Sequence, residues 1–153
     1  EVEVVAEESS LPPVGSFDYA APDFDLFDPC TEISEESLRR AELGRPEEFL
    51  TPTKLDMACR FDDYGHSGVF VSVNIVSTVV SLDDLPSNFV DVPGVAVPDR
   101  NWKAFRLAGE TESTCRAAVQ TQQGTIAVDL YEPTGAVSPS EICEHGFDIL
   151  ESL

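Results

Sequence analysis

The chain has 153 residues, of which 29 are acidic and nine are basic, and its formal net charge is −20. A chain of this length forms one domain with a working hydrophobic core and leaves no room for a second full domain. The charge excludes nucleic acid and anionic lipid headgroups as partners, because both are bound through Lys and Arg side chains that displace counterions. The hydrophobic fraction of 42% is that of a globular protein.

No stretch of the sequence could cross a bilayer. A membrane helix needs about 18 consecutive apolar residues. The longest β-like run, residues 69–80, is interrupted by four polar residues. The sequence starts at Glu1 without Met and shows no signal peptide, so we expect this residue to be a processed start.

Residues 1–29 form an acidic tail. They carry eight acidic residues, no basic residue and four prolines, a composition that predicts an extended or disordered segment. The tail also holds four aromatic residues: Phe17, Tyr19, Phe24 and Phe27. Exposed aromatic rings are unfavourable in water, so we expect them to be covered, either by the tail's own domain or by a groove on a partner. We assign these four as candidate partner-binding residues and residues 30–153 as the folded domain.

The first predicted helix begins after Ser34. This residue is a good N-cap, and two glutamates follow it in the first turn. Ile33 and Leu38 stand at the positions of a hydrophobic staple. Gly44, followed by Arg45-Pro46, predicts the end of the helix.

The middle of the chain has the alternation of apolar and polar residues that is typical of strands. We expect strands at 57–61, 68–80 and 102–107, a turn at 62–65 and a single helical turn at 81–86. The run 90–97 also has strand composition, but Pro93 and Gly94 interrupt it. Residues 57–80 therefore predict a hairpin.

A second hairpin and a helix complete the chain. Strands at 115–121 and 125–131 flank the turn Gln122-Gln123-Gly124. Ser138-Pro139-Ser140-Glu141 has the N-cap, N1 proline and N3 glutamate of a helix start. In that helix Cys143, Phe147 and Leu150 share one face, which predicts packing on a sheet. The fold class that follows is α+β, an antiparallel sheet flanked by an N-terminal and a C-terminal helix.

The cysteines indicate two disulfides and hence an oxidising compartment. Cys30, Cys59, Cys115 and Cys143 are widely spaced and the chain has only two histidines, which argues against a zinc site. Four free buried thiols in a cytosolic protein are the alternative. Three pairings are possible and the sequence does not choose between them. We expect Cys30 with Cys59 and Cys115 with Cys143, because each pair closes a loop of about 30 residues, worth roughly 3 to 4 kcal/mol.

The acidic residues and histidines show no recognisable active site. Asp23, Asp25 and Asp28 lack the glycine and the bidentate Glu of a calcium loop. His66 falls in a predicted turn, and His145 projects away from Cys143 on a helix, so we assign it to the polar face. A Ser-His-Asp site assembled from distant segments stays open. No nucleophile elbow, phosphate loop or dinucleotide fingerprint is present, so we expect neither catalysis nor a cofactor or metal.

Trp102, Lys103, Phe105 and Arg106 form a basic, aromatic patch. The first interpretation is an ordinary strand with alternating faces. The second is an interface hot spot, since such sites are rich in Trp and Arg.

Several landmarks occur together between residues 28 and 153. They are Asp28-Pro29-Cys30 before a helix, Cys59-Arg60-Phe61 on a strand, Cys115-Arg116-Ala117-Ala118-Val119 in a hairpin, and Cys143 in a terminal helix. In this the chain resembles a family of small secreted actinobacterial lipoproteins of unknown function. The resemblance implies export, a lipid anchor on a cysteine upstream of Glu1 and attachment to the outer face of the plasma membrane. It brings no catalytic residues.

These observations lead to two main functional hypotheses, beside a third, an envelope hydrolase, which would need His66 or His145 to meet a Ser or Cys in space. The first is a non-catalytic accessory subunit on the extracytoplasmic face of a membrane protein complex, with the tail as its docking segment. The second is a free-standing cell-envelope lipoprotein that binds a small apolar or lipid ligand between its sheet and its helices.

Overall fold

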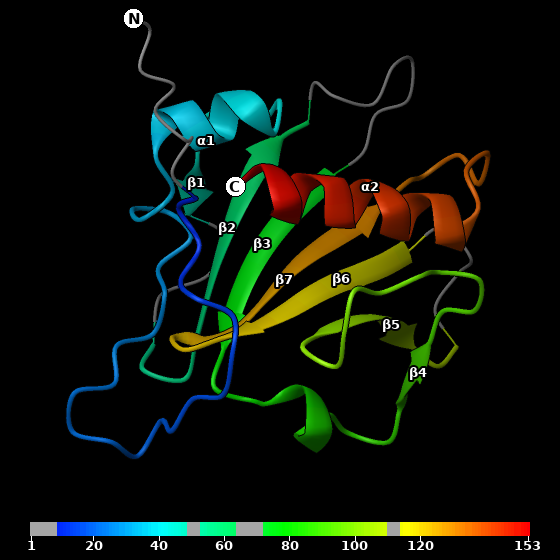
Figure 1. The fold of residues 1–153 in the computed structure, drawn as a ribbon. Helices are drawn as coiled ribbons and strands as arrows, with labels where there is room; N and C mark the ends of the chain where they lie inside the picture. The colour runs from blue at the N-terminus through cyan, green and yellow to red at the C-terminus, as the bar shows by residue number, and fades with distance from the viewer. Residues whose placement is uncertain (1–8, 49–52, 64–71, 110–113) are drawn as a thin grey trace, which may run out of the picture.

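A computed structural model describes residues 9–48, 53–63, 72–109 and 114–153 (Figure 1). The elements in chain order are α1 (Glu35–Arg40), β1 (Glu47–Glu48), β2 (Asp56–Asp62), β3 (Ser72–Thr78), the 3-10 helix η1 (Leu82–Asp84), β4 (Phe89–Asp91), β5 (Trp102–Leu107), β6 (Thr114–Thr121), β7 (Gly124–Tyr131) and α2 (Pro139–Ser152). The α+β class is confirmed.

Within the described residues, seven strands form one sheet in the order β1-β2-β3-β7-β6-β5-β4. Every neighbouring pair is antiparallel. The centre is the β3-β7-β6 group, in which β7 lies between its hairpin partner β6 and the earlier β3. Seven of the eight residues of β7 are buried or half-buried, because both faces of this strand are covered.

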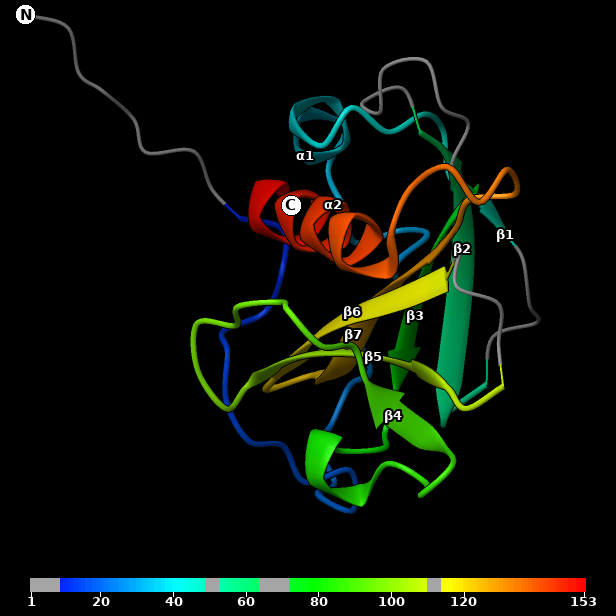
Figure 2. The ribbon, with the colours of Figure 1, turned by 90° about the vertical axis from the view of Figure 1, so that its right-hand side faces the viewer.

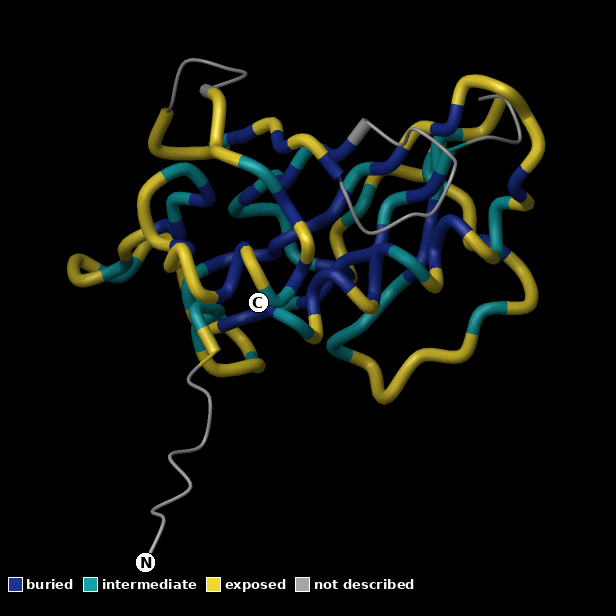
Figure 3. Tube along the Cα trace, turned by 90° about the horizontal axis from the view of Figure 1, so that it is seen from above, coloured by how far each residue is buried: buried dark blue, intermediate teal, exposed yellow. Residues whose placement is uncertain are grey.

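The two faces of the sheet are covered by different elements (Figure 2). On one face, apolar residues of β3, β6 and β7 pack with α2 in the main core, where Phe147 and Leu150 of the helix are buried. On the other face, Ala118 and Ala127 pack beneath Leu82 of η1 in a second, smaller core. Buried residues thus run through the middle of the molecule and exposed ones lie at its periphery (Figure 3). The alternation of side chains along each strand separates the two cores.

The helix starts follow their predicted caps. The Ser34 side chain accepts a hydrogen bond from the Ser37 N–H at 3.1 Å, and the Ser138 side chain accepts one from the Glu141 N–H at 3.3 Å. The predicted end of the first helix is wrong, because α1 stops at Arg40 and Glu42 takes a left-handed φ of 57° before Gly44 is reached. Strand β1 was not predicted.

The predicted strands 57–61, 102–107, 115–121 and 125–131 are confirmed to within one residue at each end. The helical turn predicted at 81–86 is η1. Of the strand predicted at 68–80, the described part is Ser72–Thr78. Tyr64 and Gly65 of the predicted turn lie outside the described residues.

Both expected disulfides are present. Cys30 is bonded to Cys59 and Cys115 to Cys143. The first joins the segment before α1 to β2, and the second joins β6 to α2. The pairing is therefore confirmed, and each bond ties an element near one end of the chain to the sheet.

Candidate interaction site

The described part of the N-terminal segment, residues 9–29, packs against the domain. Near its start, the Ser10 N–H donates to the carbonyl of Leu153 at 2.5 Å, and the Ser10 hydroxyl lies 2.7 Å from that of Ser37. Near its end, Leu26 and Phe27 are buried, with 6% and 1% of their surface exposed. This part of the segment is anchored on its own domain at both ends.

Between these anchors, residues 16–25 form a loop whose two ends are held at the tip of the β6–β7 hairpin (Figure 1). The contacts that hold it include four at the hairpin tip. The Gln122 N–H donates to the Pro13 carbonyl at 2.8 Å, the Gly15 N–H to the Gln120 carbonyl at 3.1 Å and the Phe27 N–H to the Gln123 carbonyl at 3.1 Å, and Val14 forms an isolated β-bridge with Thr121. We call residues 16–25 the pinned loop. Compact loops of about 6 to 16 residues whose ends meet are often functional.

The pinned loop is ordered by its own contacts. The Ala20 N–H donates to the Asp18 side chain at 3.0 Å, and the Ala21 N–H donates to the carbonyl of Asp18 at 3.1 Å. The rings of Phe17 and Phe24 stack across the loop with their centroids 5.7 Å apart. The loop therefore presents a formed surface instead of a free chain.

The four candidate aromatic residues fall into three environments. Phe27 belongs to the main core and is unavailable to a partner while the fold is intact, so its assignment as a partner-binding residue is corrected. Phe17 and Phe24 are half-buried against each other. Tyr19 has 59% of its surface exposed, the highest fraction among the exposed large hydrophobic side chains of the described residues. Burial in the protein's own core thus explains why an aromatic residue stands at position 27. It does not explain the aromatic residue at position 19, whose ring is exposed.

The pinned loop also carries three carboxylates. Asp18, Asp23 and Asp25 are all exposed. Together with Phe17 and Phe24 they line a shallow hollow of about 350 Å³, which Gln122 and Gln123 of the hairpin tip complete. The site therefore combines aromatic surface with a local negative charge and no basic residue.

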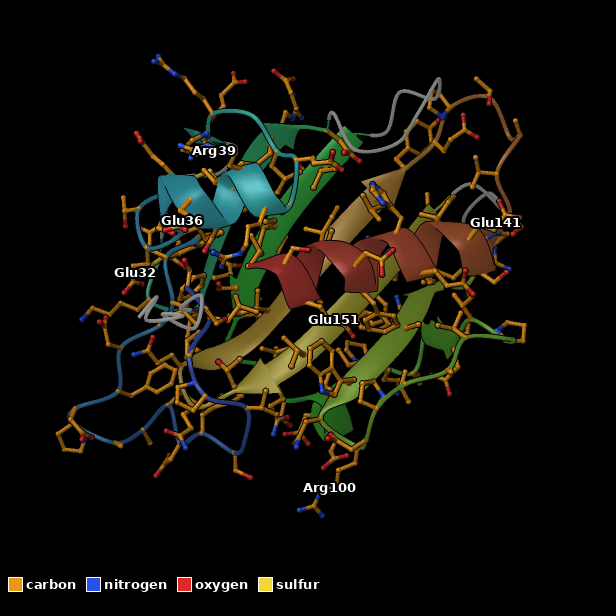
Figure 4. The ribbon with its side chains drawn as sticks, turned by 45° about the horizontal axis from the view of Figure 1, so that its top comes forward. Glu32, Glu36, Arg39, Arg100, Glu141 and Glu151 are labelled. Carbon is orange, nitrogen blue, oxygen red and sulfur yellow. A yellow bond between two sulfur atoms is a disulfide. The ribbon has the colours of Figure 1, made fainter. Side chains whose placement is uncertain are left out.

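Elsewhere, the outward faces of the helices are also acidic. Glu36 of α1 and Glu141 and Glu151 of α2 point away from the core (Figure 4). These residues lie on regular helices and outside the pinned loop. They provide a comparison for the loop, because the charge is the same and the surroundings differ.

A contact between a histidine and a buried carboxylate was missed by the sequence analysis. His145 of α2 and Asp63 lie with Nε2 and Oδ2 2.5 Å apart, and the Asp63 side chain is fully buried. The assignment of His145 to the polar face is thus corrected. No local signal could reveal this contact, since 82 residues separate the partners. His66 lies outside the described residues.

Glu132, directly after β7, is another buried carboxylate. Hydrogen bonds hold its pKa below the ordinary value, the largest contribution coming from the Thr134 hydroxyl and further ones from backbone N–H groups such as that of Ala136 at 3.0 Å. Every one of these donors belongs to the turn that leads into α2. The carboxylate thus acts as a structural cap of this turn.

The remaining candidates have structural roles in the described residues. Trp102 packs edge-on against Phe147, and Phe105 against Phe89, so their strand has two covered faces as first interpreted. Cys143 is held in a disulfide and cannot act as a nucleophile. Among residues 9–48, 53–63, 72–109 and 114–153, no three His, Cys, Asp or Glu side chains gather as metal ligands would.

Comparison of the chain with protein-family models, with curated proteins and with solved structures finds no match. The two disulfides fit an oxidising environment outside the cytoplasm. No helix within the described residues is long and apolar enough to span a membrane.

Proposed function

We propose that this chain is a non-catalytic extracytoplasmic accessory protein that binds a partner protein through the pinned loop. The observation that carries the proposal is the pairing of both loop ends with one hairpin tip, which holds Tyr19 and its neighbouring carboxylates in place. A loop ordered before binding loses less conformational entropy on association than a free tail does.

The chemistry of the loop indicates the partner's surface. Aromatic rings give large contact area at low entropic cost and are enriched at interface hot spots. Carboxylates at the rim attract a basic surface and accelerate encounter. We infer a partner with an apolar recess for Tyr19, bordered by Lys or Arg that face Asp18 and Asp23.

The membrane setting is part of the same proposal. The resemblance to small actinobacterial lipoproteins implies a lipid anchor upstream of Glu1, which would hold the domain at the outer face of the plasma membrane. A membrane protein complex exposed on that face is then the partner that the pinned loop would meet first.

Two exposed tyrosines provide a matched test. Tyr19 lies in the pinned loop and Tyr131 on β7, with 59% and 47% of their surfaces exposed. A photo-crosslinking residue at position 19 is expected to yield one discrete partner adduct in the native membrane, and one at position 131 none. With the purified partner, Tyr19→Ala is expected to weaken binding by about 30-fold, the effect of a 2 kcal/mol hot spot, and Tyr131→Ala to leave it unchanged.

Charge can be tested separately from contact. Changing Asp18, Asp23 and Asp25 to Asn alters the net charge by the same amount as changing three exposed glutamates of α2, Glu141, Glu144 and Glu151, to Gln. We expect the first variant to associate more slowly and with weaker salt dependence than the second. Equal association rates for both variants, or unchanged binding by Tyr19→Ala, would refute the role of the pinned loop.

A further inference from the structure

A second hollow is lined by residues of the sheet and of the segment that follows β3, none of which belongs to the pinned loop. It has a volume of about 250 Å³ and lies between the sheet and the segment that carries η1 and β4. Its floor is formed by Val76 of β3 and Ala127 of β7. Leu85 and Phe89 form its wall. This is the face of the sheet opposite to α2 (Figure 2).

The wall is held in place at both ends, so the hollow is part of the fold. The Leu82 N–H donates to the Gln120 side chain at 3.1 Å, and the Ala108 N–H donates to the carbonyl of Asn88 at 2.7 Å. The Phe89 ring meets the Phe105 ring edge-on with centroids 5.3 Å apart. A wall fixed in this way cannot collapse onto the small Ala127 side chain, which leaves the space above it open.

One end of the hollow is polar and carries one positive and one negative side chain. Arg116 of β6 lies beside Asp129 of β7, with Nε and Oδ2 3.6 Å apart, and its guanidinium lies 5.4 Å from the centre of the Phe89 ring. Both charged residues line the hollow. The guanidinium offers hydrogen-bond donors and the carboxylate an acceptor, so this end suits a neutral polar group that can interact with both.

We propose that this hollow binds a small neutral amphiphile, an apolar body of about ten non-hydrogen atoms with a single hydroxyl group. The size follows from the volume, since a dry apolar cavity of about 150 Å³ takes up benzene. The neutral head follows from the ion pair, because a ligand carboxylate would face Asp129 and a ligand ammonium would face Arg116. This site shares no lining residue with the hollow of the pinned loop, and it places the apolar ligand on the opposite face of the sheet from the one expected from the sequence, where α2 and the sheet pack closely.

The probe for the test is 1-octanol, which has nine non-hydrogen atoms, titrated into the intact protein and followed by NMR. We expect saturable binding with a Kd of about 1 mM or tighter, an affinity per atom well below the ceiling that the best small ligands reach. Signals of Val76, Leu85 and Ala127 should shift and those of the pinned loop should not. Octanoate and octylammonium should each bind at least about tenfold more weakly.

Filling the hollow should abolish binding. Ala127→Leu places three extra carbons in the cavity, and Val76→Met adds one non-hydrogen atom and a longer side chain from a half-buried position that tolerates change more easily. Ala96→Leu adds the same volume as the first variant at an exposed site and is the matched control. Octanol binding that is absent in the intact protein, or that persists in both filled variants, overturns the site. Tighter binding of octanoate or octylammonium overturns the neutral ligand class.

Discussion

Removing either disulfide should lower the free energy of unfolding by an amount that follows from the length of the closed loop and the burial of the cysteines. The bonds span 29 and 28 residues, so the chain-entropy model gives each about 3.6 kcal/mol at 25 °C. Their surroundings differ, because Cys115 and Cys143 are both fully buried, whereas Cys30 is half-buried. Deleting two enclosed sulfur atoms adds a cavity term of about 1 kcal/mol. We therefore expect a loss of about 3.5 kcal/mol for Cys30→Ala with Cys59→Ala, and of about 4.5 kcal/mol for Cys115→Ala with Cys143→Ala.

The assay is urea unfolding at neutral pH without reducing agent, with the unfolding free energy taken from the midpoint and slope. The free energy of unfolding of a native protein is about 5 to 15 kcal/mol in total, so either loss should move the midpoint to a much lower urea concentration. Mass measurement after alkylation of the unreduced wild-type protein is the control and should show no modified thiol. Wild-type stability in both double variants, or four alkylated thiols in the control, would refute the argument and remove the assignment to an oxidising compartment.

Two further predictions concern single residues. Because the folded pKa of Glu132 is lowered, its stabilising effect is complete above the ordinary value of 4.5 and is lost as the pH falls through the folded value. Glu132→Gln should thus be less stable than wild type at pH 7 in urea unfolding, with a gap that narrows toward pH 3, and a constant gap would contradict the role of the Thr134 hydrogen bonds. Gly124 has a φ of 108°, and an added Cβ would lie 2.7 Å from Leu26 Cδ1, whereas Gly94 has a φ of 82° and nothing within 4 Å. Gly94→Ala should cost about 1 kcal/mol of unfolding free energy and Gly124→Ala about 2 to 4, and equal losses would show that the N-terminal segment does not pack there in solution.

The sequence by itself determined what depends on neighbouring residues. Ser34 and Ser138 cap helices because a hydroxyl reaches a backbone N–H three residues later, which needs no tertiary contact. The strands of the β6–β7 hairpin were predictable because alternation and a glycine turn are local signals. The cysteine spacing indicated a compartment through chemistry alone. Four cysteines allow three pairings, and the sequence supported an expectation of one pairing without excluding the other two.

Tertiary structure decided which distant groups meet. The placement of Phe27 in the core, the pinning of residues 16–25 and the pair between Asp63 and His145 each join segments that the sequence shows only as separate patterns. The end of α1 at Arg40 followed from a left-handed Glu42, a backbone state that the sequence does not mark as glycine would. Local propensities act over a few residues, whereas packing acts between whole elements. Most of the elements could therefore be predicted from the sequence, and the two candidate sites only from the fold.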